Sequence, residues 1–364
     1  EKDYPEYYNL KFRPTTASVD EVQKTLQPDQ AIISYFLAEK NKRIYQFIIS
    51  PKKFKTLNLS LPDQFERNCK GLTNSLLFSD FNTYRNTGSL SRLLIPSLPS
   101  SIKKLVIIPS GRLGSLPFEA LALRKINGAD FKDVEFMVKR WAISYEFVAG
   151  LMLHNIPSNT AKGNIFLCAP IHFSESLNLN DLPGTETEVN TIAQLFSKTS
   201  KISIRGDANE SLVKSKEVND YNYLHFATHG IVDPVDPALS RIFLTGSDSE
   251  DGSLYCGEIY NLNLNADLVV LSACETGLGK ISTGEGVIGL SRALVYAGAK
   301  NIIVSFWKVA DESTAELMVD FYGKLLGQKK PSFSEVLRQA KIDMINKGKY
   351  ASPYYWAPFV LIGK

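Results

Sequence analysis

Hydrophobic positions in the first third of the chain form short runs of two kinds. Residues 31–38 (AIISYFLA) and 43–50 (RIYQFIIS) are rich in β-branched and aromatic side chains and are separated by the charged turn EKNK, which predicts a β-hairpin. Helical spacing follows over residues 62–78 and 81–94, and the apolar run 104–109 predicts a short buried strand. One layer of strands and helices is therefore complete by about residue 110.

A polar stretch at residues 154–164, HNIPSNTAKGN, is the best candidate for a linker because it combines Pro, Ser, Asn and Gly. A strand is predicted before it, at 142–147. Beyond it, strands and helices alternate with short joins, which is typical of a parallel sheet covered by helices on both faces. The predicted strands are 164–169, 201–204, 221–228, 267–273 and 301–306. The predicted helices are 185–196, a segment from 210, 286–297, 312–326 and 334–346.

Length and composition narrow the class of protein. At 364 residues the chain is longer than a typical single domain, so we expect two domains or one large α/β unit. Hydrophobic residues make up 44% and charged residues 22%, and no tract is long and apolar enough to cross a bilayer. The net charge of +3 comes from basic and acidic residues mixed along the whole sequence, so nucleic-acid binding is not expected.

The four cysteines, at positions 69, 168, 256 and 274, are far apart and show no CxxC spacing. We expect reduced thiols in a cytoplasm. The first residues, EKDYPEYYNLKF, contain neither an initiator Met nor the pattern of a signal peptide. The chain is therefore expected to be a fragment of a longer protein.

Two strand ends in the second half of the chain carry reactive side chains. HFATHG (225–230) places His229 and Gly230 just past one predicted strand, and LSACETG (271–277) places Cys274 just past a later one. In an open parallel sheet, residues beyond the carboxyl ends of neighbouring strands share one rim. If these two strands are neighbours, the imidazole and the thiol face each other across that rim.

A thiol and an imidazole so placed suit nucleophilic catalysis. A free thiol has a pKa of about 8.5, and a nearby imidazole accepts its proton or stabilises the thiolate. Attack on a carbonyl builds negative charge on oxygen, which backbone N–H groups must stabilise. Gly230, which lacks a Cβ, and the N–H of Cys274 are the expected donors of this oxyanion hole. Asp233 and Asp236 lie near His229 in the sequence, but nothing in the pattern assigns either the task of orienting it.

These two segments resemble the catalytic signatures of the CHAT family of caspase-like proteases, relatives of caspases and separase. The similarity continues in GEGVIGLSRALVYAGAKNIIVSFWKVAD (284–311), IIPSGRLGSLPFEAL (107–121) and LPGTETEV (182–189). It implies an α/β, caspase-like three-layer sandwich with a mostly parallel sheet, in which an inactive half, residues 1–158, precedes a catalytic half, residues 159–364. It also implies a dyad of His229 as base and Cys274 as nucleophile, and tetratricopeptide repeats upstream.

The segment FWKVAD (306–311) resembles the part of separase in which an acidic residue receives a basic side chain of the substrate. This resemblance implies that Asp311 selects Arg or Lys before the cut, with Trp307 as a wall of the pocket. Ser272 is expected to contact the substrate as well. A competing interpretation is that Asp311 caps the helix that begins with DESTAE, and one residue could serve both purposes.

Several of these residues have plainer interpretations. A Cys at the end of a buried strand is usually a small core residue, but for Cys274 the partner His229 and the extended similarity outweigh that interpretation. His225 is expected to pack into the sheet. The four histidines and their spacing predict no metal site, and no cofactor is expected. The glycines between 277 and 286 lack the Lys of a phosphate-binding loop and predict a movable active-site loop.

The expected function is hydrolysis of peptide bonds in a protein substrate through a thioester on Cys274. Access to the site is expected to depend on upstream tetratricopeptide repeats or on a regulatory partner protein, and neither nucleic acid nor a membrane is an expected partner. Two alternatives stay open. The dyad is intact but unused in an interaction module, or it hydrolyses small acyl compounds.

Overall fold

The computed structural model describes residues 16–153, 163–197, 199–233, 235–272, 285–328 and 332–364. The described chain forms two compact units. The first unit contains residues 16–153, 332–358 and 364, and the second contains the described residues between 163 and 328 together with 359–363. The division into halves at residue 158 stays a prediction.

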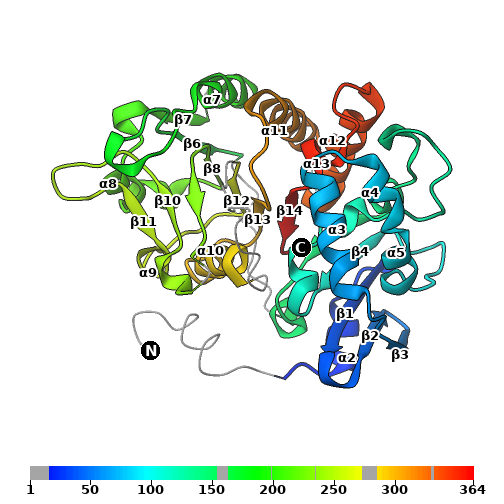
Figure 1. Ribbon diagram of the computed structural model, residues 1–364. Coiled ribbons are helices and arrows are strands. Elements are labelled where there is room, and N and C mark those ends of the chain that lie inside the picture. Colours follow the sequence, from blue (N-terminus) through cyan, green and yellow to red (C-terminus); the bar gives the residue numbers. More distant parts are fainter. Residues whose placement is uncertain (1–15, 154–162, 198, 234, 273–284, 329–331) are drawn as a thin grey trace. The chain divides into compact units, whose positions relative to one another are not determined.

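The first unit is built on strands in the order β3-β2-β1-β4-β5 (Figure 1). Its strands are β1 (Gln30–Ala38), β2 (Arg43–Ser50), β3 (Lys53–Ser60), β4 (Lys104–Ile108) and β5 (Ala142–Tyr145). Its helices are α2 (Val19–Thr25), α3 (Phe65–Leu77), α4 (Phe81–Asn86), α5 (Gly88–Leu94), α6 (Met137–Arg140), α12 (Phe333–Lys347) and α13 (Pro353–Trp356). The antiparallel pairing of β1 with β2 confirms the predicted hairpin, whereas β4 and β5 pair in parallel. β3 was not predicted because most of its side chains are exposed and no apolar run marks it.

Both faces of this sheet are covered. Alternate residues of a strand point to opposite faces, and in β1 this brings Ile32 into a cluster with Val22 of α2 and Ile49 of β2. On the other face, the hydroxyl of Tyr35 donates to the carbonyl oxygen of Leu94 in α5 at 2.6 Å.

A buried ion pair holds α12 within the first unit. Lys341 Nζ lies 3.1 Å from Oε1 of Glu119, and the two side chains are 1% and 2% exposed. The hydroxyl of Tyr145 donates to the other carboxylate oxygen of Glu119 at 2.5 Å and accepts the N–H of Phe118. Burial lowers the pKa of Lys341, and the neighbouring carboxylate opposes this shift. The late segment 332–358 is thus joined to a much earlier part of the chain.

The second unit has the strand order β14-β13-β12-β8-β6-β7 (Figure 1). Its main strands are β6 (Ile165–Ala169), β7 (Ser200–Ile204), β8 (Tyr223–Phe226), β12 (Leu268–Leu271), β13 (Ile302–Ser305) and β14 (Phe359–Ile362). Its helices are α7 (Pro183–Phe196), α8 (Glu210–Val213), α9 (Cys256–Ile259), α10 (Glu285–Tyr296) and α11 (Asp311–Leu326). All neighbouring pairs are parallel except β13 with β14. The predicted, mostly parallel sheet is therefore confirmed.

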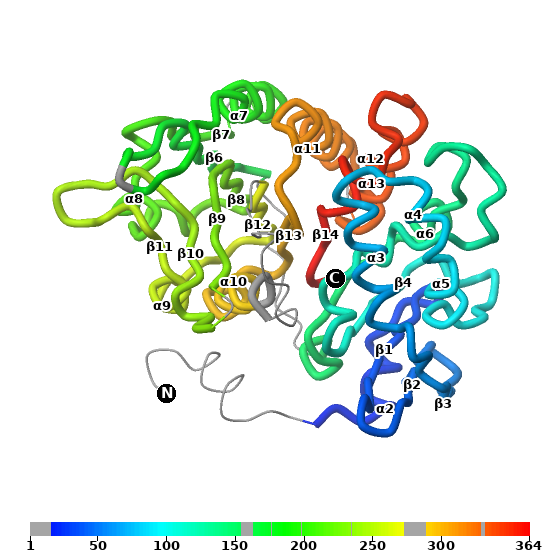
Figure 2. The backbone as a smooth tube through the Cα atoms, in the orientation of Figure 1, coloured from blue at the N-terminus to red at the C-terminus, as the bar shows by residue number. Residues whose placement is uncertain are grey.

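This parallel sheet is buried on both faces. Every residue of β6, β12 and β13 is buried, which explains why these strands appear in the sequence as unbroken apolar runs. Figure 1 shows α7 and α11 on one side of the sheet and α10 on the other. A second, antiparallel sheet in the order β11-β10-β9 follows β8 along the chain (Figure 2). Its strands, β9 (Gly230–Ile231), β10 (Arg241–Phe243) and β11 (Ser253–Tyr255), are too short to be recognised from a pattern.

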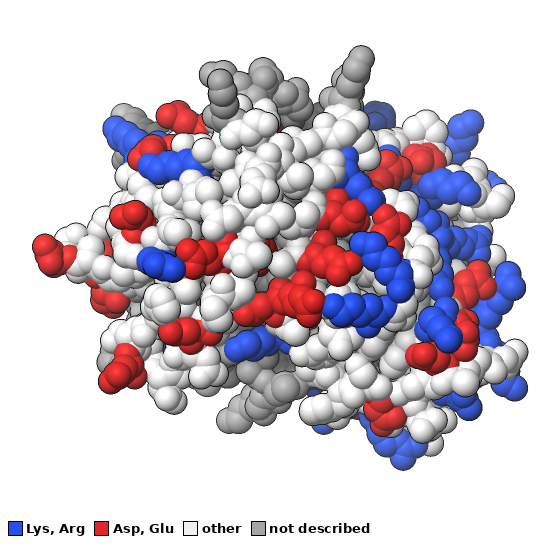
Figure 3. All heavy atoms as spheres, turned by 90° about the horizontal axis from the view of Figure 1, so that it is seen from above, with Lys and Arg blue, Asp and Glu red and all other residues white. Residues whose placement is uncertain are grey.

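Charged side chains of both signs lie on one face of the molecule. On the face shown in Figure 3, Lys and Arg side chains are interspersed with Asp and Glu side chains. Among the described residues, no helix has the length and apolar character needed to span a membrane.

Candidate active site

His229 lies just past the carboxyl end of β8, as the sequence predicts. Its side chain is 1% exposed, and Nε2 lies 2.7 Å from the carbonyl oxygen of Asn180. The imidazole packs against the ring of Phe173, with the two ring centroids 4.8 Å apart. Its own carbonyl oxygen accepts the N–H of Phe243 at 2.9 Å, which ties this residue to β10. The ring is therefore held in one orientation.

The contact with Asn180 decides which ring nitrogen carries a proton. A carbonyl oxygen only accepts hydrogen bonds, so Nε2 of His229 must carry a hydrogen whether the ring is neutral or charged. In the neutral ring the unprotonated atom is then Nδ1. Nδ1 is thus the basic atom of this side chain.

The loop between β6 and α7 presents two groups that contact the His229 ring, the carbonyl oxygen of Asn180 and the ring of Phe173. Nδ1 of His172 lies 2.7 Å from Oδ2 of Asp181, and Oδ1 of Asp181 accepts the N–H of Phe173 at 3.4 Å. The hydrogen bond from His172 lowers the pKa of Asp181. This pair closes the loop next to Asn180 and Phe173. Sequence reasoning missed the loop, because a backbone carbonyl has no residue signature and the pair shows no motif.

Cys274 lies outside the described residues. The strand that leads to it, β12, is the parallel neighbour of β8, and Leu271 lies opposite Phe226. One residue further, the N–H of Ser272 donates to the carbonyl oxygen of Phe226 at 3.0 Å. The two strands singled out in the sequence are therefore adjacent and end at the same edge of the sheet.

The other cysteines are poor nucleophiles. Cys69, Cys168 and Cys256 are free thiols that are at most 1% exposed. Burial raises the pKa of Cys69 and of Cys256 to about 12 and also raises that of Cys168, so these groups stay protonated at neutral pH. Because the thiolate is the reactive form, none of the three suits covalent catalysis.

Two residues with predicted roles flank the strand ends. Gly230 begins β9 and lies opposite Ile242 in β10. Ser272 is 4% exposed, and its Oγ has no hydrogen-bond partner within the described part of the chain. The roles of Gly230 in the oxyanion hole and of Ser272 in substrate contact stay predictions.

Asp311 is the first residue of α11, whose N-cap is Ala310. The interpretation of Asp311 as the N-cap is therefore wrong by one position, although an acidic side chain in the first turn still suits the helix dipole. Its side chain lies against Gly184, where an added Cβ would be 2.5 Å from the Cβ of Asp311. Trp307 follows β13, is 3% exposed and accepts at its carbonyl oxygen the hydroxyl of Ser305. The substrate pocket assigned to Asp311 and Trp307 stays a prediction.

The two acidic residues that follow His229 organise their own loop. The carboxylate of Asp233 accepts the N–H groups of Asp236 and Val235, which lower its pKa. Asp236 in turn accepts the N–H of Ala238 at 3.0 Å. These hydrogen bonds give both carboxylates a structural role.

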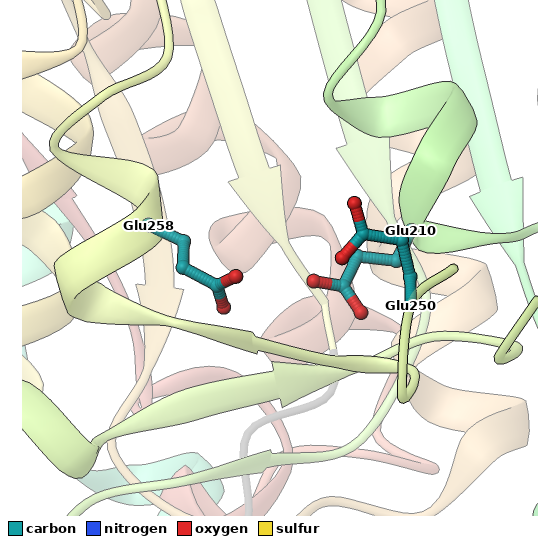
Figure 4. Close-up of side chains that lie close together, drawn as sticks. All are labelled: Glu210, Glu250 and Glu258. Carbon is teal, nitrogen blue, oxygen red and sulfur yellow. The ribbon is translucent and has the colours of Figure 1, made fainter.

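Three carboxylates elsewhere in the second unit lie at a spacing that metal ligands also show. Glu210, Glu250 and Glu258 each bring an oxygen within 4.8 Å of the other two, with Glu258 facing the other two glutamates (Figure 4). Nζ of Lys214 lies 2.7 Å from each of them. Burial lowers the pKa of Lys214. The three carboxylates raise it by more than burial lowers it, so the net pKa lies above its ordinary value. The ammonium group supplies the positive charge that this cluster needs.

The fold of this chain is that of caspase-like proteins such as separase. The solved structure of the Saccharomyces cerevisiae separase–securin complex at 2.6 Å resolution matches with a TM-score of 0.59 and 10% sequence identity, over 94% of this chain and 31% of that chain. At this identity the similarity shows the fold alone.

Within that class, the chain belongs to the CHAT domain family, whose model matches residues 85–364. Over 127 residues it is also 32% identical to proteins named Tetratricopeptide repeat protein 28 from Mus musculus and Homo sapiens. The match covers 35% of this chain and 5% of each of those proteins. This chain therefore spans only a small part of these relatives.

Proposed function

We propose that this chain is a cysteine endopeptidase in which Cys274 is the nucleophile and His229 the base. The observation that supports the proposal is the hydrogen bond from Nε2 of His229 to Asn180, because it leaves Nδ1 as the basic atom. The adjacency of β8 and β12 also supports it, since it directs the chain toward Cys274 at the same edge. The three described cysteines offer no competing nucleophile.

The reaction begins when Nδ1 of His229 takes the proton of the Cys274 thiol. The thiolate then attacks the carbonyl carbon of the scissile peptide bond, and the electron pair of the C=O bond moves to oxygen. The N–H groups of Gly230 and Cys274 stabilise this oxyanion. Nδ1–H protonates the leaving amine as the C–N bond breaks, which leaves a thioester on Cys274. Water, deprotonated by His229, then hydrolyses the thioester and restores the thiol.

The proposed substrate preference is for Arg or Lys before the cut. Asp311 supplies the negative charge, Trp307 an apolar wall and Ser272 a polar contact. The close fit between Asp311 and Gly184 supports this assignment, because it fixes the carboxylate at the start of α11.

We further propose that a partner controls access to the site in a cytoplasmic setting. The relatives from mouse and human bear the name of tetratricopeptide repeats, and the solved separase was bound to securin. Upstream repeats or a separate regulatory protein fit the same role here. Loops 232–240 and 275–285 are the segments on which such a partner would act.

The test is hydrolysis of fluorogenic peptides that carry Arg, Lys, Leu or Asp before the reporter group. We expect cleavage after Arg and Lys, loss of turnover in Cys274→Ala, and a loss of about 10²- to 10⁴-fold in His229→Ala. A thiol-reactive peptide probe should label wild-type Cys274 but not the His229→Ala variant. Labelling without any cleavage would indicate an unused site in an interaction module, and turnover of esters alone would indicate a small-molecule hydrolase.

A further inference from the structure

Three buried polar side chains near the candidate base are joined by hydrogen bonds. His225 lies on β8, four residues before His229, and is 0% exposed. Its Nε2 lies 2.9 Å from Oε1 of Glu188 on α7, and its Nδ1 lies 3.2 Å from the hydroxyl oxygen of Tyr322 on α11. One strand and two helices therefore meet at a single imidazole.

The polar atoms of these three side chains find their hydrogen-bond partners in one another. Glu188 is 2% exposed and Tyr322 is 0% exposed, so water does not replace a lost partner. Burial raises the pKa of Tyr322 well above its ordinary value, which keeps the hydroxyl neutral. The two ring nitrogens of His225 each have one partner, the hydroxyl of Tyr322 at Nδ1 and the carboxylate of Glu188 at Nε2. We call the hydrogen-bonded side chains of His225, Glu188 and Tyr322 the His225 clamp.

The clamp acts on a helix that is also held at two other points. Figure 1 shows α7 and α11 side by side. At their first turns, Gly184 leaves room for Asp311, and an added Cβ there would be 2.5 Å from the Cβ of Asp311. Further along, the rings of Phe196 and Tyr322 pack with centroids 5.7 Å apart. α11 is therefore fixed against α7 at both ends and against β8 by the clamp.

The same elements carry the two residues that the proposed function requires. His229 follows His225 along the chain beyond β8, and Asp311 begins the helix in which Tyr322 lies three turns later. We infer that the His225 clamp is a positioning device that fixes Asp311 relative to His229. It thereby sets the distance between a bound basic side chain and the bond to be cut. This inference rests on the proposed function.

Directional bonds distinguish this role from simple packing. Apolar side chains of the same volume would fill the space equally well and often do so without loss of stability. They would, however, supply no directional contact, whereas the two hydrogen bonds to one ring fix the positions of α7 and α11 relative to β8. Catalysis is sensitive to such movements, because a displacement of about 1 Å can cost about 10²-fold in rate.

The experiment compares selectivity rather than activity, since the ratio does not depend on how much enzyme is folded. Tyr322→Phe removes the hydroxyl and Glu188→Met removes the carboxylate, and each keeps a side chain of similar size. Two control variants lie on α7: Val189→Ala, which opens the apolar core, and Glu186→Gln, which loses only the half-exposed pair with Arg205. For each variant, kcat/KM is measured on peptides with Arg and with Leu before the cut.

We expect the Arg-to-Leu ratio to fall about 10- to 100-fold in Tyr322→Phe and Glu188→Met. Both control variants should keep the wild-type ratio, even where Val189→Ala lowers the melting temperature. An unchanged ratio in Tyr322→Phe would overturn the inference and leave the clamp with a structural role alone.

A second measurement separates this inference from the proposed function. Amide hydrogen exchange is followed in segments 223–231 and 311–317 of the whole chain. The clamp predicts faster exchange in both segments of Tyr322→Phe and in neither segment of Glu186→Gln. If the wild type cleaves no peptide, the proposed function fails and exchange alone decides whether the clamp joins the two segments. Faster exchange confined to the neighbourhood of residue 322 would show that it does not.

Discussion

The carbonyl oxygen of Asn180 and Nε2 of His229 lie 2.7 Å apart, so a backbone group orients the candidate base. A carbonyl oxygen carries no full charge and stabilises an imidazolium less than a carboxylate would. The contribution of this carbonyl oxygen is to fix the tautomer and the orientation of the His229 ring. The position of the carbonyl in turn depends on the loop that contains it.

That loop gives the first prediction. Asp181→Asn weakens the pair with His172, so Asn180 and Phe173 should hold His229 less firmly. We expect kcat to fall about 10-fold with little change in melting temperature, because the pair is largely exposed. The lowered pKa of Asp181 adds a pH effect. The pair is present above the ordinary pKa of an Asp and is lost as the pH falls through the lowered value.

Steady-state kinetics with an Arg peptide at neutral pH checks this prediction. Glu175→Gln is the matched control, since it removes an exposed carboxylate of the same loop that has no hydrogen-bond or ion-pair partner among the described residues. Equal kcat values in Asp181→Asn and wild type would show that the loop does not position the base.

The second prediction concerns two glycines. Gly184→Ala places a Cβ 2.5 Å from that of Asp311, so α7 and α11 must separate at their first turns. We expect a loss of about 1–3 kcal/mol in the free energy of unfolding. Gly323→Ala, in the interior of α11, meets nothing within 4 Å and should stabilise the protein by about 0.5–1 kcal/mol. Urea denaturation measures both values, and equal effects of the two substitutions would contradict the close fit.

Glu146 provides a prediction about pH. Burial raises the pKa of this carboxyl from 4.5 to about 7, although it accepts the N–H of Phe147 and lies near Lys364. Because the folded state binds this proton more tightly than the unfolded state does, protonation of Glu146 stabilises the fold. This contribution is fully present below pH 4.5 and is lost as the pH rises to about 7. The shift corresponds to about 3 kcal/mol.

Melting temperatures at pH 5 and pH 8 check this effect. The difference between the two pH values should be smaller in Glu146→Gln than in the wild type, because the amide does not ionise. Glu39→Gln, an exposed glutamate, should leave the difference as it is. If Glu146→Gln also leaves it as it is, Glu146 does not titrate in this range.

The buried pair of Lys341 and Glu119 gives the fourth prediction. Lys341→Met leaves the carboxylate without its cation in a site 2% exposed, and we expect a loss of about 3–5 kcal/mol in the free energy of unfolding. The double variant Lys341→Met, Glu119→Gln should regain more than half of this, because the amide is neutral and still accepts the hydroxyl of Tyr145. A double variant no more stable than the single one would mean that charge burial is not the cause.

The sequence predicts well where apolar runs are continuous. The fully buried β6, β12 and β13 were all identified, and their parallel order makes the ends of β8 and β12 neighbours, as the hypothesis of a His229–Cys274 pair requires. Strands without such runs were missed. β3 is largely exposed, and β9, β10 and β11 contain only two or three residues each.

The surroundings of the site were less predictable. The motif identified His229 but not the carbonyl of Asn180, because any residue type supplies a carbonyl and only the folded loop brings it within 2.7 Å. His225 was expected to pack into the sheet, and its 0% exposure confirms this. Its two polar partners, Glu188 and Tyr322, lie 37 and 97 residues away in the chain, beyond the reach of any local pattern.

Residues 332–358 complete the first unit, after which β14 (Phe359–Ile362) returns to pair with β13 in the second. Neither unit is therefore encoded by one uninterrupted stretch. No single cut separates the two units, because residues 332–358 of the first lie between α11 and β14 of the second, and both units should unfold when the last third of the chain is cut away. Limited proteolysis is accordingly expected to degrade the chain to small peptides without releasing a stable domain.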